Sequence, residues 1–162
     1  KIYQQGFLME IPTSIPAKNP KVIAGEIYIK DVSFETAHSP MIFQRARKEW
    51  NPTIIPEYHI SVNTIVEDWY EVVLCLTVKT ILGDDTAYLA EVHQAGIFSF
   101  HEIDENEVNT LLGSYCPRFL FPFARETIVS LVQKAGFNQL SLPPIEFDAN
   151  FSPLRKDTDS DD

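Results

Sequence analysis

The chain has 162 residues, of which 44% are apolar and 22% charged, and its formal net charge is −10. This length and balance fit one folded domain around a single core, and no apolar run approaches the ~20 residues of a membrane-spanning helix. The negative charge repels phosphate backbones and anionic lipids, so it argues against nucleic acid and direct membrane insertion and favours a basic protein as partner.

Residues 1–24 mix apolar side chains with Pro, Asn and Gln and show no sustained periodicity. We therefore predict an irregular N-terminal extension over this segment. Its apolar part is interrupted by prolines, and no export signal is visible. The only two cysteines, Cys75 and Cys116, have no metal-binding spacing, and a secreted chain of this size often has more. We expect a cytoplasmic protein.

Four strand patterns follow, at residues 26–36, 54–65, 69–82 and 86–100. The third is clear because Val72, Leu74 and Leu76 alternate with residues that are mostly more polar, as in a strand with one buried face. The last two strands are separated by a short loop in which Gly83 can adopt a positive φ. We predict that these two strands form a hairpin.

Residues 37–52 are predicted to be a long loop between the first two strands. A loop of this length in a small domain is usually either functional or a crossover that passes a neighbouring strand. It carries three basic residues, Arg45, Arg47 and Lys48, close to Trp50. Both interpretations remain open from the pattern alone.

Helical periodicity begins at Asp104, which together with Glu107 forms a possible capping box. A second helix is expected to run to about Ala135, with Gly136 as its C-terminal cap. The turn between the two helices is predicted to be shaped by Gly113, Pro117 and Pro122, and Pro122 is tolerated if it lies in the first turn of the second helix.

Four strands followed by helices predict an α+β fold, in which a four-stranded antiparallel sheet carries helices on one face. The other apolar faces of such a sheet need cover from a second subunit or a ligand, and the eleven Phe, six Tyr and two Trp favour oligomerisation. The chain ends with four aspartates in its last six residues. This composition predicts an acidic mobile tail over residues 152–162.

Cys116 is the residue that most invites a catalytic interpretation. A helix N-terminus nearby would lower the pKa of its thiol and favour a nucleophile. However, no histidine lies near it in sequence, and a cysteine followed by Pro117 among aromatic residues is more typical of core packing. The four histidines show no metal-binding spacing, and no phosphate-binding loop or serine-nucleophile motif occurs. We therefore predict no catalytic residues and no metal.

Several blocks of sequence, in order over residues 25–151, resemble the SecB family of bacterial protein-export chaperones. The blocks are EIYIKDVSFE from residue 26, YEVVL from 70, EVHQAGIF from 91, LGSYCP from 112, LFPFARE from 120 and FDANF from 147. The resemblance implies a homotetramer, a dimer of dimers, with no enzymatic activity, nucleotide or cofactor. It also implies that the chain holds unfolded precursor proteins in an export-competent state and passes them to the SecA ATPase.

The resemblance also assigns candidate binding residues. The implied SecA-binding residues are Asp31 and Glu35 on the first strand and Leu89 and Glu91 on the fourth. The implied client-binding groove, formed by the crossover loop and the helical layer, includes Phe43, Trp50, Tyr115 and Phe137.

Two further interpretations accompany the resemblance. Residues 7–11 (FLMEI) are similar to a client segment, so we hypothesise that the extension occupies a client groove. Residues 45–48 look like an insertion in the crossover loop. The alternative function is that of a related chaperone dedicated to one client, such as an antitoxin, and a small-molecule enzyme is a more distant third.

Overall fold

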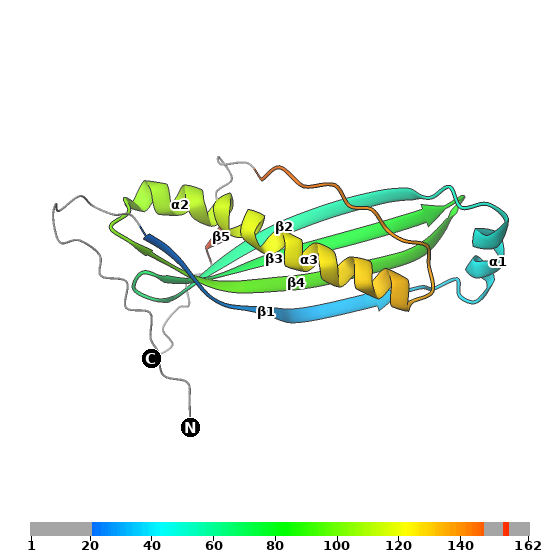
Figure 1. Cartoon of the computed structure of the whole chain (residues 1–162), viewed down its shortest axis with the longest axis horizontal. Helices are drawn as coiled ribbons and strands as arrows, with labels where there is room; N and C mark the ends of the chain where they lie inside the picture. The colour runs from blue at the N-terminus through cyan, green and yellow to red at the C-terminus, as the bar shows by residue number, and fades with distance from the viewer. Residues whose placement is uncertain (1–20, 148–153, 156–162) are drawn as a thin grey trace, which may run out of the picture.

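In the computed structural model, which describes residues 21–147 and 154–155, long strands form one sheet with helices on one face (Figure 1). The elements in chain order are β1 (Lys21–Glu35), α1 (Met41–Lys48), β2 (Thr53–Val66), β3 (Trp69–Leu82), β4 (Asp85–His101), α2 (Glu105–Gly113), α3 (Tyr115–Lys134) and β5 (Leu154–Arg155). The strand order is β1-β4-β3-β2-β5, and the pairs that β1 to β4 form with one another are all antiparallel. The predicted α+β fold is confirmed.

The sheet extends beyond the predicted strands at both of its edges. β1 begins at Lys21, inside the predicted irregular extension, because Lys21 to Ala24 find partners at the end of the long strand β4. Leu154 and Arg155 pair in parallel with β2, so the predicted mobile tail is wrong at these two residues. The hypothesis about residues 7–11 lies outside the described residues.

The segment predicted as a long loop contains the helix α1. One side of α1 is apolar and packs against the hydrophobic core. Ile42 is 2% exposed, and Phe43 and Ala46 pack against the core. The Arg45 guanidinium bonds the Asp85 carboxylate at 2.6 Å, which fixes α1 at the β3–β4 hairpin. The crossover interpretation is confirmed, because the segment connects β1 to β2, which β4 and β3 separate in the sheet.

The helical layer differs from prediction in where it breaks. Asp104 caps α2 by accepting a hydrogen bond from the Asn106 amide at 2.9 Å. The chain leaves helical geometry at Ser114 alone, and α3 begins at Tyr115. Pro117 is tolerated in the first turn of α3 because amides there need no intrahelical partner. Pro122 lies further along, inside α3, so the condition of a first-turn position is not met.

The hydrophobic core lies between the sheet and α3, which packs mainly on β4 and β3. Alternate residues of β3, from Val72 to Val78, are completely buried on the helix side, as the alternation predicts. After Gly136, which has a φ of +87°, the chain runs back beside α3 and covers β2 (Figure 1). Phe147 on this return segment contacts Tyr58 of β2 at 5.0 Å between ring centroids. Among the described residues, no helix is long and apolar enough to cross a membrane.

Gly96 allows α3 to approach the sheet closely. A Cβ atom at Gly96 would lie 2.8 Å from Ile27 Cδ1 and 2.9 Å from Leu120 Cδ2, closer than real Cβ contacts. Leu120 is a fully buried residue of α3, and Ile27 lies on the edge strand β1. The absence of a side chain at position 96 therefore sets the distance between α3 and the sheet.

We expect Gly96→Ala to destabilise the fold by about 1–3 kcal/mol, because a methyl group must displace packed side chains. Urea unfolding followed by circular dichroism measures this loss. Gly25→Ala is the matched control, since its Cβ would lie at an ordinary 3.5 Å from the Ile97 carbonyl oxygen. Equal stabilities of the two variants would contradict this account of the helix–sheet distance.

Candidate protein-binding surfaces

The face of the sheet opposite α2 and α3, here called the outer face, carries the four implied SecA-binding residues. The register pairs Glu35 with Leu89, Ser33 with Glu91 and Asp31 with His93. Residues directly opposite each other on antiparallel strands point to the same face. The structure therefore brings Asp31, Glu35, Leu89 and Glu91 together on two neighbouring strands, with both β1 carboxylates exposed.

A polar network stabilises the same face and joins its outer strands to its centre. The Glu71 carboxylate of β3 accepts hydrogen bonds from Lys30 Nζ at 2.9 Å, from Asn63 Nδ2 at 2.8 Å and from the Tyr28 hydroxyl. Lys30 is at a register shift of β1, and such irregularities redirect side chains. The network thus links β1 and β2 through β3.

The electrostatics of this network follow from its donors. Burial alone would raise the pKa of Glu71, but hydrogen bonds from Lys30, Tyr28 and Asn63 outweigh burial and lower the pKa. Burial, together with the hydrogen bond to Glu71, raises the pKa of Tyr28 to about 12. Glu71 is therefore an anion at neutral pH, and its negative charge is largely compensated by Lys30.

Glu91 belongs to a second group of side chains on the outer face. Its carboxylate bonds His93 Nε2 at 2.9 Å and accepts a hydrogen bond from Thr77 Oγ1 at 2.8 Å. The bonds from His93 and Thr77 lower the pKa of Glu91. Cys75 lies directly opposite His93, and burial and the Glu91 carboxylate raise the pKa of its thiol. The sequence did not reveal this group, because its members come from two strands.

Three of the four implied client-groove residues meet at the end of the sheet that carries α1. The ring of Phe137 lies 4.8 Å from that of Phe43 and 6.1 Å from that of Trp50. Phe34 of β1 and Tyr88 of β4, which sequence reasoning missed, also contact Phe137. Beside these rings is an open pocket of about 160 Å³, lined by Phe43, Ala46, Arg47, Trp50, Gly136, Phe137 and Asn138.

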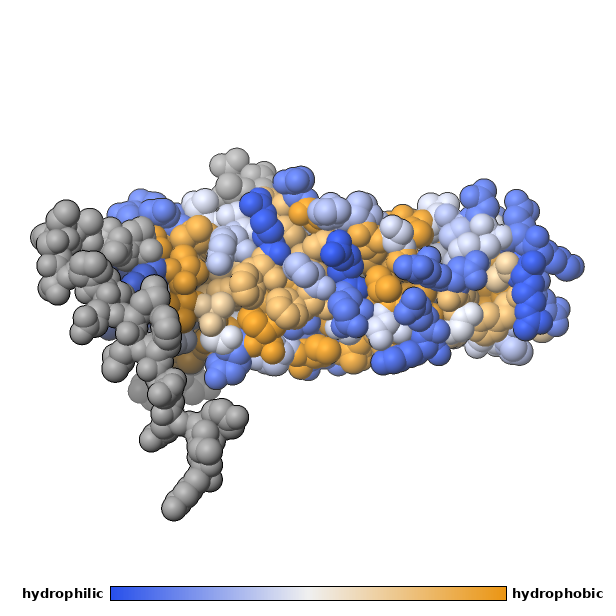
Figure 2. All heavy atoms as spheres, viewed as in Figure 1, coloured by the Kyte–Doolittle hydropathy of each residue, from blue (hydrophilic) through white to orange (hydrophobic). Residues whose placement is uncertain are grey.

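The fourth implied groove residue, Tyr115, does not join this cluster. It begins α3, whereas Phe137 follows the end of that helix, and a helix of 20 residues is about 30 Å long. Tyr115 instead starts an exposed aromatic stripe with Phe119 and Phe123, at a spacing of four residues. Figure 2 shows apolar residues along this helical face of the molecule, interrupted by polar ones.

The aromatic stripe lies close to the edge strand β1. A shallow cavity of about 520 Å³ separates them, lined by Ile27, Tyr28, Ile29, Gln94, Pro122, Phe123, Glu126 and Thr127. On β1, Ile29 and Val32 are 49% and 43% exposed. Within residues 21–147 and 154–155, β1 has a neighbouring strand on one side only. Large apolar side chains on such an edge strand are typical of a surface that another chain covers.

Cys116 is confirmed as a packing residue. Its side chain is completely buried in the core between α3 and the sheet. Burial raises the pKa of its thiol well above the ordinary value, so the thiol remains protonated at neutral pH. It therefore lacks the thiolate that nucleophilic catalysis requires.

These features define an α+β scaffold with a polar, partly acidic outer face and an aromatic cluster on the helix side of the same sheet. A family profile described as "Preprotein translocase subunit SecB" matches residues 16–157. The protein-export protein SecB of Nitrosococcus oceani is 45% identical over 148 residues, which are 91% of this chain and 90% of that protein. The chain belongs to the SecB family and has the role of a protein-export chaperone.

A solved structure shows the same fold at much lower sequence identity. It is a SecB-like chaperone of Mycobacterium tuberculosis in complex with a ChAD peptide from the HigA1 antitoxin. The TM-score is 0.64 at 16% identity, and the match covers 78% of this chain and 92% of the other. At this identity the similarity supports the arrangement of sheet and helices and not individual binding residues.

We expect Glu71→Gln to destabilise the protein by about 1–3 kcal/mol at pH 7, because charged hydrogen bonds are lost. The lowered pKa of Glu71 contributes stability above the unfolded-state value of about 4.5, and this contribution is lost as pH falls through the folded-state pKa. The difference between the original protein and the variant should therefore shrink between pH 5 and about pH 3.

Urea unfolding at fixed protein concentration across this pH range measures the difference. The control is Glu57→Gln, which changes an exposed carboxylate of β2 that has no hydrogen-bond partner among the described residues. If the difference in stability between the original protein and Glu71→Gln stays constant down to pH 3, the network contributes through packing and not through charge.

Proposed function

We propose that this SecB-family chaperone holds unfolded precursor proteins without nucleotide, in the cytoplasm, and delivers them to the SecA ATPase. The observation that carries this proposal is the back-to-back position of two surfaces. Phe34 and Tyr88 belong to the aromatic cluster on the helix side, while the next residues, Glu35 and Leu89, point to the outer face. A client and a docking partner would therefore bind opposite faces of the same strands.

The aromatic cluster is suited to unfolded chains. Aromatic rings accept varied apolar side chains without demanding one hydrogen-bond pattern, and the pocket beside Phe43 and Trp50 is open at the surface. Its volume of about 160 Å³ fits a single side chain and not a folded partner. Binding strength would then come from several such sites acting on one client.

We assign Tyr115 to a separate part of the client surface, because it lies with Phe119 and Phe123 on α3 and not in the pocket. The rest of this stripe, Phe119 and Phe123, and the edge strand β1 are the surfaces that we propose for subunit contacts in a homotetramer, a dimer of dimers. Their exposed apolar side chains support this assembly, since a monomer would leave them in water. Assembly would also multiply the number of aromatic pockets available to one client.

On the outer face, we propose that Asp31, Glu35, Leu89 and Glu91 bind SecA. Exposed carboxylates around one apolar side chain suit a basic partner, and their charges would speed encounter at low salt. The net charge of −10 also favours a basic partner.

A chaperone dedicated to one client is the second candidate function. The observation that favours it is the Mycobacterium tuberculosis structure, in which a chaperone of the same fold binds a peptide from an antitoxin. The two functions differ in the number of clients that they protect.

The test of the main proposal is suppression of aggregation of several chemically unfolded precursors, without nucleotide, with the particle mass measured on the same samples. We expect protection of all the precursors by a particle of four times the 18.5 kDa chain mass. The double variant Phe43→Ala with Trp50→Ala should require at least about tenfold more chaperone, because the pocket loses two of its rings.

Met41→Ala is the matched control for this variant, because Met41 is 63% exposed on the same helix α1. Protection of one precursor only would favour the dedicated chaperone. Unchanged protection by the double variant would remove the pocket from the client surface, and a monomeric particle would contradict the assignment of β1 and α3 to subunit contacts.

For the docking surface, we expect Glu91→Lys to weaken SecA binding at least about tenfold, or ~1.4 kcal/mol, since it reverses a charge at the centre of the contact. Surface plasmon resonance at low and high salt measures the effect. Glu107→Lys, an equal charge reversal on α2 at the helical face, should leave binding unchanged. Equal affinities for Glu91→Lys and the original protein would place the docking site elsewhere.

A further inference from the structure

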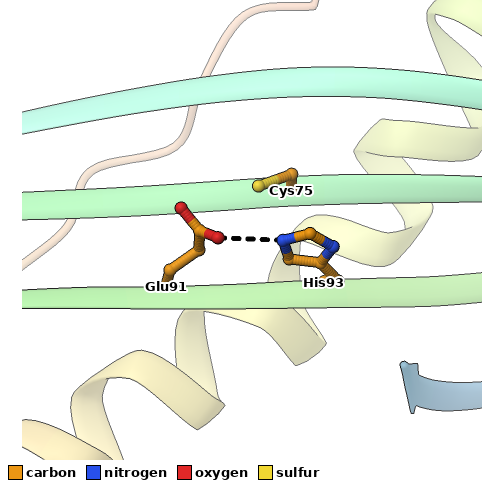
Figure 3. A group of neighbouring side chains, drawn as sticks. All are labelled: Cys75, Glu91 and His93. Carbon is orange, nitrogen blue, oxygen red and sulfur yellow. Dashed lines mark hydrogen bonds and ion pairs between the residues drawn. The ribbon is translucent and has the colours of Figure 1, made fainter. Parts of the chain in front are cut away.

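Three side chains with metal-binding atoms converge on the outer face at the centre of the sheet. Cys75 comes from β3, and Glu91 and His93 come from β4, and all three point toward one another (Figure 3). The Cys75 Sγ atom, a Glu91 carboxylate oxygen and a His93 ring nitrogen all lie within 4.8 Å of one another. The closest pair, His93 Nε2 and Glu91 Oε1, is 2.9 Å apart.

This combination of atoms matches the preferences of zinc. Thiolate sulfur, imidazole nitrogen and carboxylate oxygen are the three donor types that Zn²⁺ takes in proteins, at about 2.0–2.3 Å. In a tetrahedral site these bond lengths separate neighbouring donors by about 3.3–3.8 Å. The observed separations are therefore within a small side-chain rotation of a coordination shell. The mixture of sulfur and nitrogen favours zinc over magnesium or calcium, which prefer oxygen alone.

The surroundings of the cluster supply the remaining parts of such a site. The Thr77 hydroxyl donates to Glu91 Oε2 at 2.8 Å and orients the carboxylate, leaving Oε1 toward His93. The register places His59 of β2 directly opposite Cys75, and Asp31 of β1 directly opposite His93. A fourth ligand is thus available from a neighbouring strand, or from water because the side chains are only half-buried.

The backbone beneath the cluster is hydrogen-bonded on both sides. β3 and β4 are inner strands, each hydrogen-bonded to a strand on either side. Direct neighbours across such strands hold their Cβ atoms about 4.5–5.5 Å apart, so the Cys75–His93 pair is preset for a shared ligand. A metal ion would need to order side chains only, without moving the sheet.

We propose that Cys75, Glu91 and His93 form a zinc-binding site on the outer face, with its fourth position taken by water or His59. The site is separate from the client pocket and does not depend on the proposed function. It shares one residue, Glu91, with the proposed docking surface. The test therefore changes Cys75 and His93, which the docking proposal does not use.

The experiment is isothermal titration of the untagged, metal-free, reduced protein with Zn²⁺, and with Co²⁺ as a spectroscopic probe. We expect one ion per chain and a thiolate-to-cobalt charge-transfer band in the near ultraviolet. Cys75→Ser should abolish the band, and Cys75→Ser and His93→Gln should each weaken zinc binding at least about tenfold, since even changes around metal ligands cost that much.

His101→Gln is the matched control, because it removes another half-buried histidine of β4 that lies outside the cluster. Its affinity for zinc should equal that of the original protein. The proposal is overturned if the original protein shows no thiolate band, or if Cys75→Ser and His93→Gln bind zinc as tightly as His101→Gln. Circular dichroism verifies that each variant keeps the folded sheet.

Discussion

The alternation of side chains along β4 is the constraint on which the other features of this protein depend. β4 lies between β1 and β3, so both of its backbone edges are hydrogen-bonded and its residues cannot change face without breaking two ladders. On one side Tyr88, Val92 and Phe98 build the core, and on the other Leu89, Glu91 and His93 form the outer face. One strand therefore determines the core and the polar surface together.

Within one chain, the side chains of the outer strands of the sheet are less buried than those of the inner strands. The inner strands bury most of their residues, whereas β1 and the first half of β2 are largely exposed. The Glu71 network compensates in part, because it holds β1 through Tyr28 and Lys30 and β2 through Asn63. Polar bonds thus hold the edges where apolar burial within the chain is small. This division agrees with the proposed subunit contact at β1.

Much of the fold could be predicted because the local signals were strong. The four antiparallel strands follow from alternation, and Gly83 and Gly136 have the positive φ values predicted for their turns. The helix α1 was missed because its first turn follows Pro40 without a capping side chain, so the segment resembled a loop. The break at Ser114 was missed because Pro117 and Pro122 suggested interruptions that the helix α3 accommodates.

The candidate site was predictable only in part, and the reason is register. Asp31, Glu35, Leu89 and Glu91 were assigned by resemblance, and strand pairing explains why they share one face. To predict the cluster of Cys75, Glu91 and His93, one would also need the register between β3 and β4. An uninterrupted ladder from the hairpin turn would place Cys75 opposite Val92, whose side chain belongs to the core.

The sheet avoids that arrangement through a shift of one residue between Thr80 and Ile81. This shift turns Cys75 to the outer face, opposite His93, and keeps Leu74 and Leu76 in the core. No local sequence pattern indicates this shift, because it depends on how the side chains on both faces of the sheet pack. The same irregularity that preserves the core therefore also assembles the thiol, imidazole and carboxylate on the outer face, where only a three-dimensional structure reveals them.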